Sequence, residues 1–98
     1  NTVIEFLMKI KEENIEITGA YLFGSYATNS ENKWSDIDVA IISPAFSDDR
    51  FEERVRLLMI SHKIDSRIEP APFKPEWFVD EDPLVWEIKK HGIPISFQ

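Results

Sequence analysis

Cysteine is absent from all 98 residues of the chain. A disulfide framework and a thiolate metal site are therefore excluded, and this fits a protein of the reducing cytoplasm. No apolar run approaches the about 20 residues that span a bilayer, and no basic stretch followed by an apolar segment opens the chain as a signal peptide would. We therefore expect a soluble, cytoplasmic protein with no membrane partner.

Basic residues are also scarce. Eleven Lys and Arg stand against 18 Asp and Glu, which gives a net charge of −7. General binding of nucleic acid needs clustered Lys and Arg to neutralise phosphates, so we expect none, although a phosphate bridged by a metal ion stays possible. The length suffices for one hydrophobic core but not for a second lobe. We expect a single domain over residues 1–98, with any bulky acceptor supplied by a partner.

The first half of the chain is predicted to contain one helix and two strands. Apolar residues recur at steps of three and four near the N-terminus, as in an amphipathic helix. They are Val3, Ile4, Leu7, Met8 and Ile10, with Ile15 as a further candidate. A short apolar run over residues 15–23 indicates a buried strand that ends at Gly24. Residues 24–34 indicate a loop with room for a short helix, and residues 37–42 a second strand stopped by Pro44.

A second helix and a third strand are predicted next. Residues 49–63 have helical periodicity, with a stripe that we expect to be buried. Its members are Phe51, Val55, Leu58, Met59 and His62. Residues 64–70 alternate as a strand, with Asp65, Arg67 and Glu69 on one face. Prolines 70, 72 and 75 are expected to force a loop after it.

The C-terminal part is predicted to end in a helix. Residues 76–79 can form a short turn, and residues 83–91 a helix that is capped by Asp82 and ended by Gly92. His91 in its last turn complements the helix dipole, and we assign it no chemistry. Ile93, Ile95 and Phe97 then form an edge strand or simply pack on the core.

Two aspartates open the second predicted strand. Residues two apart on a strand point to the same side, so Asp36 and Asp38 are expected to project together. Like charges so close are unfavourable unless a cation lies between them. Mg²⁺ prefers oxygen ligands and often takes one or two carboxylates together with substrate phosphates. The pair therefore indicates half of a magnesium site.

The other half is expected from Gly24-Ser25, where the first predicted strand stops. Glycine lets the backbone approach a phosphate, and exposed N–H groups at a turn favour an anion, as does the Ser25 hydroxyl. A turn that merely begins with a serine is the simpler alternative.

This pattern resembles the polymerase-β-like nucleotidyltransferases, which are marked by Gly-Ser, ten residues, then Asp-x-Asp. Ten residues, Tyr26 to Ser35, separate Ser25 from Asp36. The chain is most similar to the minimal nucleotidyltransferases of bacteria and archaea, small domains often encoded beside a HEPN-domain partner as antitoxin and toxin. The resemblance covers nearly the whole chain and extends to Ile68-Glu69-Pro70 and to the ending around Pro83, Glu87, Ile88, Lys89 and Gly92. It implies an α+β fold with a small mixed sheet of three to four strands flanked by helices.

The resemblance also implies a reaction. Asp36 and Asp38 would hold Mg²⁺, and a third carboxylate, for which Glu69 is our candidate, would complete the metal site and act as the base. Gly24 and Ser25 would bind the phosphates of ATP or another nucleoside triphosphate. An NMP group, AMP if the substrate is ATP, would pass to a hydroxyl of a protein or a small molecule.

The chain departs from the family in three ways. Residues 26–29 lack the glycine and arginine that many relatives carry after Gly-Ser, and the third acid is a glutamate where many have aspartate. Asp65 takes the role of Glu69 if the strand register differs. Third, the loop of residues 24–34 holds one basic residue, Lys33, so basic help for the triphosphate would come from Lys33, from Arg67 or from a partner.

Two other functions stay open. The first is a binding module that neutralises a HEPN-type toxin by direct contact without catalysis, since an acidic surface attracts a basic partner. The second is a subunit whose acceptor-binding lobe lies on another chain. Both imply a homo- or hetero-oligomer.

Overall fold

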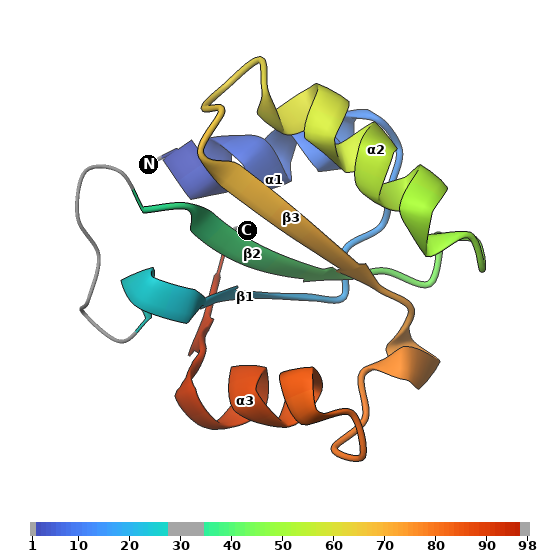
Figure 1. The fold of residues 1–98 in the computed structure, drawn as a ribbon. Helices are drawn as coiled ribbons and strands as arrows, with labels where there is room; N and C mark the ends of the chain where they lie inside the picture. Colours follow the sequence, from blue (N-terminus) through green and yellow to red (C-terminus); the bar gives the residue numbers. More distant parts are fainter. Residues whose placement is uncertain (1, 28–34, 97–98) are drawn as a thin grey trace.

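The computed structural model describes residues 2–27 and 35–96. Figure 1 shows the order of the elements along the chain. They are α1 (Thr2–Glu12), β1 (Gly19–Phe23), η1 (Gly24–Tyr26), β2 (Ile37–Ile42), α2 (Arg50–Ser61), β3 (Ile68–Phe73), η2 (Pro75–Trp77), α3 (Pro83–His91) and β4 (Ile93–Pro94), where η marks a short 3₁₀ helix. Lys33 and Phe97, both named in the sequence analysis, lie outside the described residues.

The strands form one mixed sheet in the order β3-β2-β1-β4. β1 runs antiparallel to β2 and to β4, whereas β2 and β3 are parallel. The register places Asp38 of β2 opposite Phe23 on one side and opposite Glu69 on the other. The predicted α+β fold is thereby confirmed, and the sheet brings residues 23, 38 and 69 into one row.

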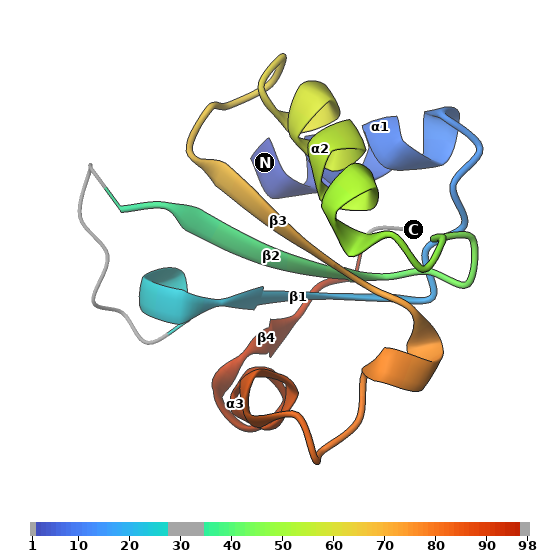
Figure 2. The ribbon, with the colours of Figure 1, turned by 45° about the vertical axis from the view of Figure 1, so that its right-hand side comes forward.

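The helices cover the two faces of this sheet (Figure 2). α1 and α2 lie on one face and α3 lies on the other. On β2, Val39 and Ile41 pack toward α1 and α2, whereas Ala40 and Ile42 pack toward Val85 and Ile88 of α3. Side chains alternate along a strand, so Asp38 shares its face with Ala40 and α3. No helix among residues 2–27 and 35–96 is long and apolar enough to cross a membrane.

Several predicted elements are confirmed. β2 spans residues 37–42 and α3 spans residues 83–91, as expected, and the Asp82 side chain caps α3 by accepting a 2.9 Å hydrogen bond from Leu84 N. The first helix is confirmed too, although Ile15 lies beyond its end. β1 begins at Gly19 and not at Ile15, because residues 13–18 form the turn and the extended segment that connect α1 to the sheet.

The prediction that prolines end the third strand was wrong. β3 runs through Pro70 and Pro72 to Phe73, and begins at Ile68. The carbonyl oxygens of Arg67 and Phe73 accept hydrogen bonds from β2 and the residue after it. Odd-numbered residues therefore direct their backbone polar groups to β2, and the proline nitrogens point to the open edge, where no N–H is needed.

The predicted buried stripe of the second helix was also wrong. The helix begins as predicted, with Asp49 as its cap, but its buried residues are Glu53, Leu57 and Ser61. Phe51 and Met59 are 77% and 67% exposed. Glu53 can be buried because its carboxylate accepts a 2.6 Å hydrogen bond from Ser47 N and pairs with Arg56. The helix is thus rotated so that the apolar stripe predicted for the core faces outward.

Candidate nucleotide and metal site

The turn at the end of β1 depends on glycine for two reasons. Gly24 has φ +73°, in the left-handed region that other residues rarely adopt. A Cβ atom at this position would also lie 2.2 Å from Oδ2 of Asp38. The turn continues as η1, which is closed by a 3.1 Å hydrogen bond from Ala27 N to Gly24 O. The backbone of the turn therefore lies directly against the Asp38 carboxylate.

The two predicted aspartates lie close together beside this turn. Asp36 is exposed just before β2, and Asp38 is half-buried near the start of β2. Partial burial raises the pKa of Asp38, and the negative charges of Asp36 and then Glu69 raise it further. Within residues 2–27 and 35–96, no Lys or Arg pairs with Asp36 or Asp38. Among the residues that the structure describes, the negative charges of Asp36 and Asp38 thus have no compensating cation.

Glu69 is near Asp38 in the sheet but is engaged elsewhere. Its Oε2 atom accepts a 2.8 Å hydrogen bond from an Arg54 guanidinium nitrogen of α2. In the part of the chain that the structure describes, no three carboxylate or imidazole side chains come close enough to hold one metal ion. Asp36 and Asp38 offer the hard oxygen donors that suit Mg²⁺, and Glu69 can join them only by turning a carboxylate oxygen away from Arg54.

Asp65, the alternative third acid, is placed differently. It lies in the turn before β3, and its carboxylate accepts hydrogen bonds from Arg67 N, Nε and a terminal guanidinium nitrogen at 2.9, 3.2 and 2.9 Å. These bonds lower the pKa of Asp65. Arg67 also donates a 3.2 Å hydrogen bond to the Tyr26 hydroxyl. Asp65 and Arg67 thus tie the start of β3 to η1, and the register puts Glu69 beside Asp38 instead.

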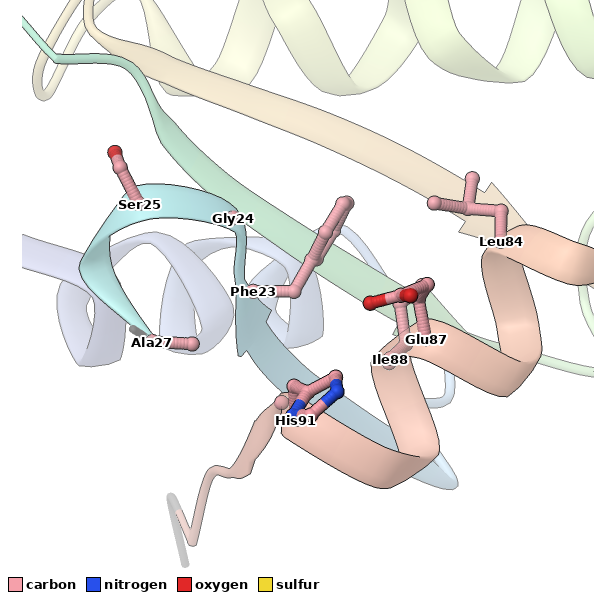
Figure 3. A pocket seen from close by; sticks show the side chains of 9 residues that line it. Phe23, Gly24, Ser25, Ala27, Leu84, Glu87, Ile88 and His91 are labelled. Carbon is pink, nitrogen blue, oxygen red and sulfur yellow. The ribbon is translucent and has the colours of Figure 1, made fainter. Parts of the chain in front are cut away.

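A pocket of about 420 Å³ opens between the Gly24 turn and α3 (Figure 3). This volume lies within the usual range for small-molecule sites, about 300–1,000 Å³. The turn and α3 form its walls. The lining residues are Phe23, Gly24, Ser25, Ala27, Leu84, Glu87, Ile88, His91 and Gly92. Because Gly24 also touches Asp38, the pocket and the aspartates share one turn.

The α3 side of this pocket was missed by the sequence analysis. α3 was predicted with its correct bounds, yet Leu84, Glu87 and His91 were given no role. In Figure 3 the Glu87 side chain extends from α3 toward Phe23. These residues follow Gly24 by about sixty positions in the chain. Only the packing of α3 against β1 brings them together, and amphipathic spacing does not show which element a helix will meet.

Comparisons with known proteins add a family and a fold. A family model described as "nucleotidyltransferase domain" matches residues 3–93. One similar solved structure is a putative nucleotidyltransferase from Sulfolobus solfataricus, at 15% identity and a TM-score of 0.68, covering 99% of this chain and 78% of that one. A second, described as a toxin-antitoxin with AMP-PNP, shows 22% identity and a TM-score of 0.62 over 97% of this chain and 73% of that one. The comparison with curated proteins found no match.

Proposed function

The chain belongs to the nucleotidyltransferase domain family, as the motif spacing predicted, and we propose that it transfers AMP from Mg²⁺-bound ATP to a hydroxyl of a protein or small molecule. One observation carries this proposal. Asp36, Asp38 and Glu69 crowd their negative charges beside the Gly24 turn, and no cation of the described residues neutralises the two aspartates. Such an arrangement is unfavourable by itself and is relieved by a divalent ion with its phosphate ligand.

Asp36 and Asp38 would hold the metal, and Glu69 would join them. Divalent ions held there would supply positive charge to the phosphates and to the leaving pyrophosphate. The backbone of Gly24 and the Ser25 hydroxyl would hold phosphate oxygens at the turn. Glu69 would accept the proton of the acceptor hydroxyl while the hydroxyl oxygen forms a bond to the α-phosphorus. The bond between the α-phosphorus and the oxygen that bridges it to the β-phosphate would break, and pyrophosphate would leave.

The pocket would hold the nucleobase. Phe23 and Leu84 supply aromatic and apolar surface on which a planar base can stack. The Glu87 carboxylate at the same wall can accept a hydrogen bond from an exocyclic amino group, which adenine carries and uracil lacks. This feature favours a nucleotide whose base carries an amino group, ATP among them, over UTP.

A toxin of the HEPN class is the acceptor that the resemblance suggests. The similarity to a structure described as a toxin-antitoxin with AMP-PNP supports an antitoxin role, in which the chain modifies its partner. Neutralisation by contact alone is the second candidate, and it is favoured by the net charge of −7, which would attract a basic partner.

The test combines the chain with a candidate HEPN-domain partner, ATP radiolabelled at the α-phosphate and Mg²⁺. We expect label on the partner with the wild-type chain and none with Asp36→Asn/Asp38→Asn. Asp65→Asn is the matched control, because it removes a carboxylate that Arg67 already neutralises. Full toxin neutralisation by the double variant would overturn the catalytic proposal and favour contact.

A further inference from the structure

α2 carries a row of exposed apolar side chains on the side turned away from the sheet. Phe51, Val55 and Met59 are 77%, 38% and 67% exposed, and they follow one another at steps of four residues. Residues at this spacing lie above one another on a helix surface. We call these three residues the α2 stripe. In Figure 2 α1 lies beside α2 on the same face of the sheet, and Met59 lines a groove together with Lys9 of α1.

The α2 stripe is unusual for a free surface. Single exposed apolar residues are common, but a contiguous apolar patch of large side chains marks an interaction site. The rest of α2 does not require it, because Leu57 alone is fully buried in the core and Ile60 packs at its margin. Replacing Phe51 and Met59 by polar residues would leave the contacts of α2 with the sheet intact. Their presence therefore indicates a partner surface.

The stripe is symmetric about its own centre. Phe51 and Met59 are equally distant from Val55, at four residues or about 6 Å of helix rise. A second α2 laid antiparallel across Val55 would place each Phe51 against the other copy's Met59. Large aromatic and thioether side chains would then pack in both halves of the contact.

The flanking charges complement each other in the same arrangement. Glu52 and Arg56, both exposed, lie on the same flank of the stripe. Along the helix axis Glu52 lies about 4.5 Å before Val55 and Arg56 about 1.5 Å after it. When the second helix runs the opposite way, its Arg56 falls within about 3 Å of Glu52 along the axis. The row then holds two arginines bracketed by two glutamates, with no net charge, and each Arg56 lies as close along the axis to the other copy's Arg56 as to its Glu52. Arg56 also pairs with Glu53 of its own helix at 2.9 Å, so the attraction between these charges across the contact is weak.

We propose that the α2 stripe is the interface of a homodimer, in which a second copy of this chain packs its α2 antiparallel across a two-fold axis at Val55. A helix of 12 residues buries little surface, so the dimer is weak and forms reversibly. α2 and the pocket beside α3 lie on opposite faces of the sheet, so both pockets stay open in the dimer. This inference does not depend on the proposed function.

Sedimentation velocity of the full chain tests the proposal. We expect the sedimentation coefficient to rise from a monomer value to a dimer value between the low micromolar and the millimolar range. Phe51→Glu/Met59→Glu should weaken the dimer by about tenfold or more. Val79→Glu is the control, since Val79 is 40% exposed but lies outside α2. A wild-type chain that stays monomeric throughout would overturn the proposal.

Cysteine cross-linking tests the two-fold axis itself. The chain has no cysteine, so Val55→Cys introduces a single thiol, and the axis would bring it opposite its own copy. We expect Val55→Cys to form a disulfide-linked dimer on mild oxidation much faster than Val79→Cys. Equal rates for the two variants would overturn the proposed arrangement. Circular dichroism melts serve as the check that both variants are folded.

Discussion

Two acidic residues near the start of β3 have opposite surroundings: Asp38 of the neighbouring strand β2, and Asp65 of the turn before β3. Asp65 accepts three hydrogen bonds from Arg67, and its pKa is lowered. Asp38 is half-buried beside Asp36 and Glu69, and its pKa is raised. The chain therefore neutralises one carboxylate and crowds the other. An acid with its own cation stabilises the fold, whereas an acid among acids indicates a place for an external cation.

The largest expected effect is on activity at the crowded acid. Asp38→Asn removes a proposed metal ligand, and the several kcal/mol that metal ions supply in such transition states correspond to a rate loss of about 10³-fold. Asp65→Asn should change the rate only slightly. Label transfer from ATP under identical conditions measures both. Equal losses for the two variants would erase the distinction between the two acids.

The next effect concerns the turn that touches Asp38. Gly24→Ala forces a Cβ atom into a left-handed residue and against the Asp38 carboxylate, so we expect destabilisation by about 1–3 kcal/mol and a strong loss of transfer. Gly19→Ala is the matched control, because its nearest contact would be 3.4 Å from Ile42 Cδ1. Urea denaturation compares the two. A fully stable Gly24→Ala variant would show that the turn is not held as described.

Of the two acids, Asp65, which Arg67 neutralises, should matter more for stability. Asp65→Asn is expected to cost no more than about 1 kcal/mol at neutral pH, since it weakens hydrogen bonds to Arg67 that solvent already screens. The lowered pKa means that the native state binds this proton less readily than the unfolded state. Its contribution is therefore present above the ordinary carboxyl pKa and lost as pH falls through the native pKa. Melting temperatures of wild type and variant should converge in acid.

Substitution of Asp38, the crowded acid, should change the stability of the fold in the opposite direction and by a smaller amount. Without metal, Asp38→Asn should stabilise the fold by about 0.2–1 kcal/mol, because a like charge directly opposite Glu69 is removed. The raised pKa of Asp38 favours the native state below the ordinary carboxyl pKa, and this contribution is lost as pH rises through the native pKa. The Asp38→Asn variant should thus be more stable than the wild type at neutral pH, and this difference should disappear in acid. A loss of stability at neutral pH would contradict this.

The smallest expected effect concerns Arg54, which holds Glu69. Both side chains are partly exposed, so Arg54→Met should change stability by less than about 1 kcal/mol. Divalent ion binding should instead become severalfold tighter, because Glu69 is released toward Asp38. Arg54→Lys keeps a competing cation and serves as the control. Calorimetric titration with Mg²⁺ distinguishes the variants, and weaker binding by Arg54→Met would mean that Arg54 supports the site.

The features around Asp38 and Asp65 that the sequence could predict are those set by neighbouring residues in the chain. Local residues predict the Gly24 turn, β2 and the capped α3: a glycine after an apolar run, an apolar run stopped by a proline, and a capping aspartate. All three elements were placed correctly. Glu69 was named as a neighbour of Asp38 only through the family resemblance, and the hydrogen bonds of Asp65 with Arg67 and of Glu69 with Arg54 were not predictable, because they depend on register and helix packing. Pro70 and Pro72 suggested an early end to β3, and only its position at the sheet edge permits them. The same limit explains α2, whose periodicity predicted a helix but not the face that packs.

The most direct test of the central claim is calorimetric titration of the intact chain with Mg²⁺ and a non-hydrolysable ATP analogue. The account predicts one saturable binding event for the wild type and for Asp65→Asn, and none for Asp36→Asn/Asp38→Asn. The same binding heat and affinity in the double variant would show that the crowded aspartates hold no metal and no nucleotide.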